Sequence, residues 1–545
     1  MTRMATGLAI GALAVAGACL RADDYEARRQ ALVDRPRAVI WDDDGCDMSH
    51  YPIGRKDLVG KPVSVRNFES VMLEATERTK VDAIFYSGTM GFGYFTASRA
   101  GDWFTNEVAD VRTEPWRNKA AAFKAAFDTD ALQMAVGFAR RTGKEIFLSL
   151  RFNDNHDSEG DWNNPSVHLS PFKRANPDCL VGMNSGKPVK CCGWSAADFA
   201  QEKVRDFCRQ YVRAFLENYD LDGIAYDFFR HPQLFARVAR GGRASQAELD
   251  VMTGLMLRLK AIGEEVGRKR GRPFVFCARV PDSVAYCRAI GIDLERWLRL
   301  KAVDFLIVGG YFQLRPWRLS ADLAHRHGLK CYASLDESRI RARQIPGRGS
   351  RACLVARMAA ADAAGMDGVF HFNLEYADHG FQRDVLNVRP SETAFLDKLY
   401  FATYTGGGYL PRHFLVGGDG FAEVPGVDPT APVRLGKGQV HRFGLPMGDA
   451  FPPDGPNRAR VDVMVLADSP DGRAPRVTVN GKRLSDAATE KEGLFTFAAD
   501  PAAFARGDNE VSVRAESELL LRDFAVRVTW SRPAGLNFNA KPRIN

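Results

Sequence analysis

Short runs of apolar, β-branched and aromatic residues recur between residues 37 and 372, and each is followed by a loop and a stretch with helical spacing. Hydrophobicity within the runs is continuous rather than alternating, which is typical of parallel strands covered on both faces. The pattern predicts eight strands that alternate with helices: Arg37–Trp41, Val81–Tyr86, Glu145–Leu150, Gly223–Asp227, Phe274–Ala278, Val303–Val308, Leu329–Ser334 and Gly368–Phe372.

Eight strand–helix units over this length favour an α/β fold of the (β/α)8 TIM-barrel type, from about residue 35 to residue 404. A doubly wound open sheet is the alternative, but no GxGxxG follows the first strand. One helix is expected over Ala196–Asn218, because Ser195-Ala-Ala-Asp198 has the spacing of a helix cap.

The pattern changes after about Phe401, where turn-rich stretches and alternating segments replace the helices. Asn480-Gly481 is a strong signal for a type I′ hairpin. We therefore predict a small antiparallel β-sandwich over residues 410–530, followed by a tail over 531–545. Its predicted strands are Arg460–Leu466, Arg476–Val479, Leu494–Phe497, Glu510–Arg514 and Phe524–Trp530.

The overall composition is that of a soluble globular protein, with 45% apolar and 26% charged residues. This excludes a disordered chain, a collagen-like repeat and a multi-span membrane protein. The net charge of +8 is spread along the chain without a basic block, so no nucleic-acid partner is expected. The sequence does not indicate an oligomeric state.

The N-terminus has the pattern of an export signal. Arg3 precedes the apolar run Gly7–Ala18, and Ala16-Gly17-Ala18 supplies small residues for a cleavage site. We expect a signal peptide over residues 1–22 and a secreted or periplasmic protein, with Cys19 as a possible lipidation site. No later segment has the length and apolarity of an integral membrane segment.

Candidate chemistry lies where the predicted strands end, because the carboxyl ends of barrel strands point into one cup. Long insertions rich in aromatic residues follow the second and third strands, Ser87–Asn118 and Asn153–Gly193, and this composition suits sugar rings. The alternative is that these aromatic residues only pack the loops. The polar residues at strand ends are Asp42, Asp43, Asp44, Arg151, Asn153, Asp154, His156, Asp227, Arg230, His231, Asp282, Tyr311, Asp336, Glu337, His371, Asn373 and Glu375.

The densest group of these residues ends the fourth strand, in Asp222-Gly-Ile-Ala-Tyr-Asp227-Phe-Phe-Arg230-His231-Pro232. Burial beside aromatic rings would raise the pKa of Asp227, while Arg230 would lower it. The alternative is a structural Asp227 that caps the next helix or pairs with Arg230.

This segment resembles the fourth-strand signature of the glycosyl-hydrolase-like 10 group, which are secreted bacterial barrel proteins. Leu148-Ser-Leu-Arg151-Phe-Asn153-Asp154-Asn-His156-Asp157 and Asp367-Gly-Val-Phe-His371-Phe-Asn373 resemble the third and eighth strands of the same group. The resemblance covers residues 35–400 and implies a glycosidase-like barrel whose strand-four carboxylate is Asp227. It fixes neither the sugar nor the second carboxylate.

We therefore expect a secreted glycoside hydrolase that cleaves a poly- or oligosaccharide with two carboxylates. Asp227 is the first, and Asp336 or Glu337 the second, with Glu375 in reserve. No metal or other cofactor is expected. The residues expected to bind substrate are Asp42, Asp43, Arg151, Asn153, Asp154, His156, Arg230, His231, Tyr311, His371, Asn373 and Glu375. The alternative is a carbohydrate-binding protein that has lost catalysis.

Two further motifs suggest other chemistry but are incomplete. Asp42-Asp-Asp44-Gly45 mimics the start of a phosphatase of the haloacid-dehalogenase type, but no downstream acidic pair completes that site. Cys179, Cys191 and Cys192 lack the CxxC spacing of a zinc site. Cys277, Cys331 and Cys353 lie in apolar runs and are predicted to be buried.

Overall fold

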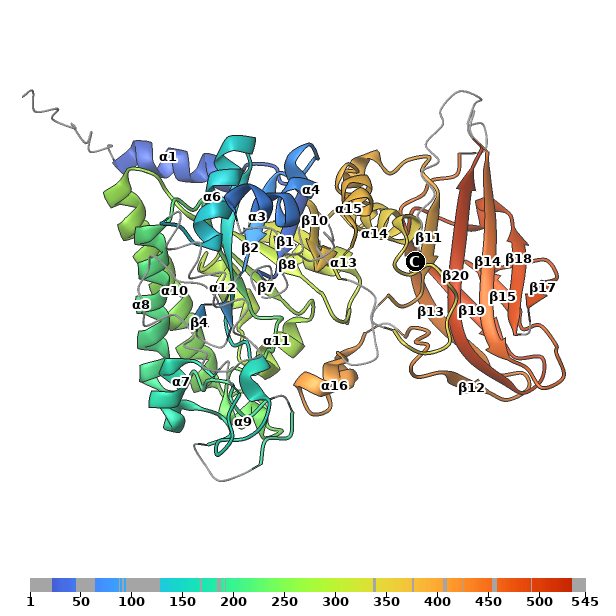
Figure 1. Cartoon of the computed structure of the whole chain (residues 1–545). Helices are drawn as coiled ribbons and strands as arrows, with labels where there is room; N and C mark the ends of the chain where they lie inside the picture. Colours follow the sequence, from blue (N-terminus) through green and yellow to red (C-terminus); the bar gives the residue numbers. More distant parts are fainter. Residues whose placement is uncertain are drawn as a thin grey trace, which may run out of the picture.

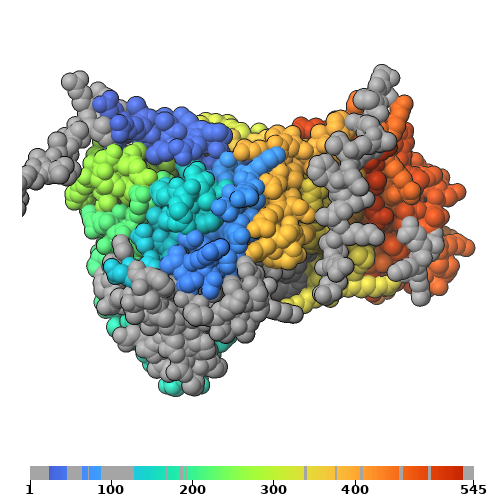
Figure 2. Space-filling model, turned by 45° about the horizontal axis from the view of Figure 1, so that its top comes forward, coloured from blue at the N-terminus to red at the C-terminus, as the bar shows by residue number. Residues whose placement is uncertain are grey.

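The computed structural model describes residues 22–45, 64–87, 89–90, 93–94, 128–166, 169–183, 188–191, 193–336, 340–374, 377–404, 409–423, 425–452, 458–491 and 493–531. The N-terminal domain is a parallel barrel, and the C-terminal domain contains a pair of antiparallel sheets beside it (Figure 1). In Figure 2, helix α1 (Ala22–Val33) lies across one end of the barrel, with the sandwich at the barrel's side.

Eight parallel strands close the barrel in the order β1-β10-β9-β8-β7-β6-β5-β2. All eight strands predicted from the hydrophobic runs are confirmed, and the closure rules out the doubly wound open sheet. The strands are β1 (Val39–Asp43), β2 (Ala83–Tyr86), β5 (Glu145–Arg151), β6 (Gly223–Asp227), β7 (Val275–Val280), β8 (Phe305–Val308), β9 (Lys330–Leu335) and β10 (Gly368–Phe372).

Helices cover the outside of the barrel (Figure 1). They are α3 (Val65–Met72), α4 (Glu74–Glu77), α6 (Ala131–Thr142), α8 (Glu202–Asn218), α10 (Gln246–Arg270), α11 (Val284–Ile290), α12 (Leu294–Arg299), α13 (Trp317–Arg326), α14 (Arg351–Ala363) and α15 (His379–Leu386). Shorter helices in the connections are α7 (Pro171–Ala175), α9 (Ala236–Ala239) and α16 (Pro411–Phe414), and 3-10 turns occupy His156–Ser158, Pro177–Cys179, Pro390–Glu392, Gly418–Phe421 and Pro501–Ala503.

The helix predicted over Ala196–Asn218 begins later than expected, at Glu202, so the predicted cap is wrong. The Ser195 hydroxyl donates to the buried carboxylate of Asp157 instead of capping a helix. Asp157 in turn accepts a hydrogen bond from buried Lys173 at 2.7 Å. Buried charged groups are stable only when they are hydrogen-bonded, and the Ser195 hydroxyl supplies one such bond to the buried ion pair. Ser195 therefore stabilises the loop rather than the start of the helix.

Aromatic rings fill the lower interior of the barrel. Phe147 stacks on Phe85 with ring centroids 4.5 Å apart and meets Phe305 edge-on at 6.1 Å. Buried Arg37 lies over the Phe305 ring and donates to the Glu145 carboxylate at 2.7 Å. Side chains alternate in and out along a strand, so the partners of these residues in register also point inward.

The C-terminal domain consists of two antiparallel sheets, with orders β11-β20-β14-β18-β17 and β13-β19-β15-β16. Phe443 and Phe524, from different sheets, pack edge-on at 4.9 Å, so the sheets form a sandwich. The five predicted strands are confirmed within β14 (Ala459–Asp468), β15 (Arg476–Val479), β18 (Leu494–Ala499), β19 (Gly507–Arg514) and β20 (Leu519–Trp530).

Shorter strands complete the domain: β11 (Lys398–Phe401), β12 (Val433–Leu435), β13 (Val440–Met447), β16 (Lys482–Arg483) and β17 (Ala488–Lys491). Asn480 and Gly481 connect β15 to β16 with φ of 48° and 79°, as the type I′ turn requires. A further two-stranded sheet, β3 (Thr89–Met90) with β4 (Gly93–Tyr94), lies in the insertion after β2.

The two domains share a buried core. Strand β11 precedes residue 404 and therefore lies within the range predicted for the barrel, yet it pairs with β20 of the sandwich. A cluster across the junction joins barrel-side and sandwich-side residues: Ile345, Cys353, Leu399, Phe401, Met464, Leu466 and Ala525. Cutting the chain near Tyr404 would expose this cluster, so the contribution of the sandwich is better tested by point substitutions.

The cysteines predicted to be buried, Cys277, Cys331 and Cys353, are buried and free. Cys179 is also free, Cys191 is buried, and Cys192 lies outside the described residues. Among the described residues, no helix combines the length and apolarity that a membrane crossing requires.

A buried ion pair should dominate the stability of the junction. Arg348 donates to Asp523 and lies over the Phe401 ring at 4.1 Å, with both charged side chains buried. Arg348→Ala should lower the free energy of unfolding by about 3–5 kcal/mol, because it leaves Asp523 buried without its counter-charge. Urea unfolding measures this loss.

The matched control is Arg343→Ala, which removes an exposed pair with Asp468 across the same junction. This variant should cost no more than about 1 kcal/mol. Equal losses in the two variants would contradict a special role for the buried pair.

Candidate functional site

Three charged residues stand in register across neighbouring strands at the carboxyl end of the barrel. Arg151 on β5 is opposite Asp227 on β6, and Asp227 is opposite Arg279 on β7. The exposed fractions of the three residues are 4%, 3% and 1%. Alternation along the strands points all three toward the barrel interior, since Phe147 shares their face. The row therefore places Asp227 between two buried arginines. Arg279 contacts the Asp227 carboxylate, while the guanidinium of Arg151 pairs with Asp44 and Asp154 at 3.5 and 3.7 Å.

Asp227 is held by three donors. Its Oδ1 accepts from the backbone N–H groups of Phe229 and Arg230 at 2.9 and 3.0 Å, and its Oδ2 accepts from Arg279 Nη1 at 3.0 Å. The structural alternative is thus partly right, because Asp227 does cap the following turn, although its ion-pair partner is Arg279 rather than Arg230. These donors stabilise the ionised carboxylate in a fixed orientation.

Asp42, near the end of β1, is a second buried carboxyl group at this end of the barrel, and its surroundings differ from those of Asp227. It pairs in register with Phe85, so it faces the same interior. Burial raises the pKa of Asp42 well above its ordinary value, and the negative charge of Asp227 raises it further, against the hydrogen bond from Ser149 and the two arginines. Burial therefore favours the protonated form of Asp42, and Asp227 lies close enough to influence it.

A second polar network follows β5 and β6. Arg230 donates to Nε2 of His156 at 2.6 Å, so the ring proton of His156 lies on Nδ1 and donates to Asp154 at 2.7 Å. Arg230 also donates to the Tyr311 hydroxyl. Burial opposes ionisation of Asp154, but His156, His231 and Arg151 outweigh it and hold its pKa well below the ordinary value.

The side chains of Asp154, His156 and His231 lie close enough to suggest a metal site, since their ligand atoms are within 4.8 Å of one another. Their hydrogen bonds do not fit one. His156 Nδ1 carries a proton, and His231 Nδ1 accepts from the backbone N–H of Asn155 at 3.2 Å. Arg151 and Arg230 also border the group and would repel a cation.

Several residues predicted to bind substrate also make contacts that hold the structure together. The Asn153 amide bonds the backbone of Ala197 and Gln233 and fixes the loop after β5. Asp43 accepts from the N–H of Gly45 at 2.8 Å. His371 pairs in register with Trp41, so it points outward to the helices.

Asn373, directly after β10, is buried and has φ of 58°. Asp336 is buried after β9, where Arg357 of α14 donates to its backbone carbonyl. Asp282 accepts from the backbone N–H groups of Leu314 and Arg315 and so anchors the loop after β8. The predicted residues Glu337 and Glu375 lie outside the described residues.

The aromatic insertions are only partly described. Trp162 and Trp194 pack edge-on with ring centroids 6.2 Å apart, and Trp194 Nε1 donates to the carbonyl groups of Ser158 and Gly160. These two rings therefore pack their own loop. Phe92, Phe95, Trp103 and Trp116, as well as the Tyr94 side chain, lie outside the described residues.

Arg279 was missed by sequence reasoning. It lies directly after the predicted strand Phe274–Ala278 and is buried over the Phe372 ring, 3.9 Å from its centroid. A Cβ at Gly310 would come within 2.4 Å of its Nη2, so this glycine is needed for the arginine to fit. A charged residue at the end of an apolar run signals a buried partner, and that signal could have identified Arg279.

A cleft of about 890 Å³ leads away from this end of the barrel toward the sandwich. At the barrel its lining includes Gly310, next to Arg279, and Ser334, two residues before Asp336. At the far end it includes residues of β13 and β19 and the Asn480 turn. The cleft therefore joins the charged end of the barrel to one sheet of the sandwich.

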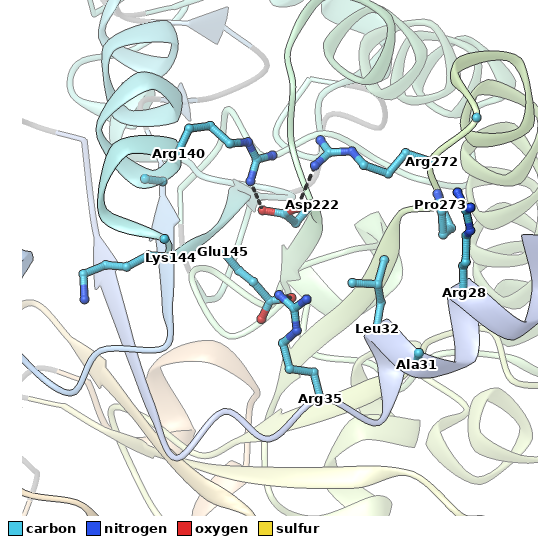
Figure 3. Close-up of a pocket in the computed structure, with 13 residues that line it drawn as sticks. Arg28, Ala31, Leu32, Arg35, Arg140, Lys144, Glu145, Asp222, Arg272 and Pro273 are labelled. Atoms are coloured by element: carbon cyan, nitrogen blue, oxygen red, sulfur yellow. Dashed lines mark hydrogen bonds and ion pairs between the residues drawn. The ribbon is translucent and has the colours of Figure 1, made fainter. Parts of the chain in front are cut away.

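A second pocket, of about 450 Å³, lies at the opposite end of the barrel beside α1 (Figure 3). Arg140 and Arg272 both point to Asp222 there, with N–O distances of 2.8 and 3.3 Å. Because barrel enzymes place their chemistry at the carboxyl end, these ion pairs are assigned to stability.

The buried histidine His371 should make the protein sensitive to acid. Burial, and next the charge of Arg357, lower its pKa to about 3, so the folded protein keeps the ring neutral while the unfolded chain takes up a proton below about pH 6.5. Its contribution to stability is therefore present above that pH and is lost as the pH falls.

His371→Phe should flatten the dependence of unfolding free energy on pH by up to roughly 1.4 kcal/mol per pH unit between about pH 6 and pH 4. Urea unfolding across this range measures the slope. His327→Phe, at a half-buried histidine after α13, is the control. An unchanged slope in His371→Phe would contradict the assignment.

No protein-family model and no curated protein sequence matches the chain. Among solved structures, the chain is similar to α-L-fucosidase isoenzyme 2 from Paenibacillus thiaminolyticus, with 12% identity and a TM-score of 0.40 over 66% of this chain and 49% of that one. It is also similar to the glycoside hydrolase domain of PgaB (BpsB) from Bordetella bronchiseptica, with 13% identity and a TM-score of 0.38 over 65% and 100%.

A family GH18 chitinase from Chromobacterium violaceum matches with 11% identity and a TM-score of 0.38, over 91% of this chain and 88% of that one. The three names are those of a fucosidase, a glycoside hydrolase domain and a chitinase. At these identities and TM-scores the functional proposal has to rest on the residues at the barrel end.

Proposed function

We propose that the chain is a glycoside hydrolase that cleaves a poly- or oligosaccharide with Asp227 and a second carboxyl group at the carboxyl end of the barrel. The observation that carries this proposal is the contrast between Asp227 and Asp42. Both are buried and face the interior, but Asp227 is held by three donors, while burial raises the pKa of Asp42. A carboxylate held by donors and a carboxyl group whose burial favours its protonated form can supply a base and an acid in one site.

In this assignment Asp42 protonates the glycosidic oxygen as the sugar–oxygen bond breaks. The Asp227 carboxylate either attacks the anomeric carbon or takes a proton from the attacking water. The first route retains and the second inverts the anomeric configuration, and their carboxyl separations are about 5–5.5 Å and 6.5–9.5 Å. Arg279 and two backbone N–H groups hold the Asp227 carboxylate in place before substrate binds, which lowers the reorganisation needed in the transition state.

Asp336 is the competing candidate for the acid. It is buried at the end of β9, roughly across the barrel from β6, and the cleft reaches Ser334 on the same strand. Glu337 and Glu375, the other candidates from the sequence, remain to be tested by substitution. Asp42 is preferred because it faces the same interior as Asp227 and because burial raises its pKa.

Export is included in the proposal. The pattern of residues 1–22 supports a signal peptide and a secreted or periplasmic enzyme, with Cys19 as a possible lipid attachment site. Such an enzyme would meet its polysaccharide substrate outside the cytoplasm. N-terminal sequencing of the protein from the periplasm and medium of an expressing bacterium tests this aspect.

Asp227→Asn should lower kcat at least ~10²–10⁴-fold, because positioned acid–base groups contribute about that much. The substrate is first found by a screen of aryl glycosides and of bacterial and algal polysaccharides. Circular dichroism and urea unfolding establish that the variant is folded. A folded variant that keeps more than about a tenth of the activity would make Asp227 structural.

The matched control is Asp220→Asn, which changes an exposed carboxylate just before the other end of β6. It should keep wild-type turnover, because Asp220 only pairs with surface arginines. If no member of the screen is cleaved, the chain is assigned instead to the non-catalytic carbohydrate-binding class.

Asp42→Asn should slow turnover strongly for a polysaccharide and much less for a dinitrophenyl glycoside, whose leaving group needs no protonation. The basic limb of the pH profile of kcat/KM should also disappear, since that limb reports the loss of the acid's proton. Asp336→Asn is measured in parallel. If Asp336→Asn shows this dependence on the leaving group and Asp42→Asn does not, the acid is Asp336.

A further inference from the structure

The cleft between the barrel and the sandwich is larger than one reacting sugar unit needs. Its volume of about 890 Å³ lies near the top of the range for pockets that enclose small ligands. It begins at Ser334 on β9 and at Gly310, which lies against Arg279, the ion-pair partner of Asp227, and it ends on the sandwich. A chain bound at the barrel end would extend along it.

The sandwich wall of the cleft is the outer face of the sheet formed by β13 and β19. Phe443 is buried and packs toward Phe524 of the other sheet, so its neighbours Arg442 and Gly444 point outward. Gly444 is opposite Glu510 in register, and Pro446 is opposite Asp508. Both acidic side chains are exposed. The wall thus presents polar groups on a flat sheet, which suits sugar hydroxyls.

The charges of the cleft favour an uncharged ligand. Four arginines line it, and four acidic residues balance them: Arg315, Arg357, Arg412 and Arg442, with Asp419, Asp428, Asp508 and Glu510. On the barrel side Arg315 pairs with Glu423 and Arg412 with Asp419. On the sandwich side, neither Arg442 nor Glu510 has an ion pair or side-chain hydrogen bond within the described residues of the chain. These two side chains are available to a ligand.

We infer that this cleft binds an uncharged polysaccharide chain, whose reacting unit lies at the barrel end and whose further units lie against β13 and β19 of the sandwich. The inference rests on the proposed function and assigns the sandwich a role in holding the chain. Arg442 and Glu510 donate to and accept from the hydroxyl groups of units distant from the cleaved bond. The chemical step does not involve them.

The test uses full-length Arg442→Ala/Glu510→Ala, which removes one charge of each sign and leaves the net charge unchanged. For the neutral polysaccharide identified in the screen, kcat/KM should fall at least ~10-fold through a higher KM, because hydrogen bonds to charged groups have about that effect. For the aryl glycoside of the same sugar, kcat/KM should stay within about two-fold, well under that tenfold loss. Arg514→Ala/Glu518→Ala is the matched control, since both residues are exposed and lie outside the cleft lining.

An unchanged KM for the polysaccharide would overturn the inference, and so would an equal loss on the aryl glycoside. Binding is measured separately by calorimetry with neutral gluco-, manno- and N-acetylhexosamine oligosaccharides of increasing length, and with oligogalacturonate as the acidic comparator. Binding that strengthens with length and is lost in the cleft variant supports the inference even without any turnover, which would overturn only the proposed function. Tighter binding of oligogalacturonate, or no binding of any oligosaccharide, would overturn the inference.

Discussion

The carboxyl end of the barrel is organised by the need to neutralise one buried carboxylate. An ionised Asp227 without partners would cost several kcal/mol in this environment, so it is flanked in register by Arg151 and Arg279. Arg279 fits only because residue 310 is glycine, and it rests on the Phe372 ring. Asp227 also orients the chain after β6 through two backbone N–H groups, which directs Arg230 toward His156 and Tyr311.

In this arrangement a structural role and a catalytic role for Asp227 do not exclude each other. The donors that hold the carboxylate in place also fix its orientation. Stability and turnover must therefore be measured together in any variant of this residue, because a loss of turnover in a destabilised protein says nothing of chemistry. The same applies to Asp42, whose pKa is raised chiefly by burial.

The fold was predictable because its signals are local. Continuous apolar runs identify the barrel strands, and Asn480-Gly481 identifies its hairpin from two residues. Ion-pair partners lie far apart in the sequence. Arg279 contacts Asp227 only once β6 and β7 pair, and the Ser195 hydroxyl donates to Asp157 rather than capping a helix. The role of β11 was missed for the same reason, since its partner β20 is more than a hundred residues away in the sequence. Asp42 was recognised as a site residue, but its burial, which sets its protonation state, required the closed barrel.

The two ends of β6 show how environment decides the role of a carboxylate. Asp222, just before the strand, pairs with Arg140 and Arg272, which are both partly exposed, and it also accepts the backbone N–H of Ile146. Water screens those ion pairs, so they hold α6 and the chain before β7 to the barrel and leave no strong local field. Asp227, at the other end of the same strand, is about equally buried, with exposed fractions of 3% for Asp227 and 6% for Asp222, but its ion-pair partner Arg279 is buried as well. The field of Arg279 is therefore screened less by water than that of Arg140 and Arg272. The exposure of the arginine partners, rather than that of the aspartates, separates the two ends of the strand.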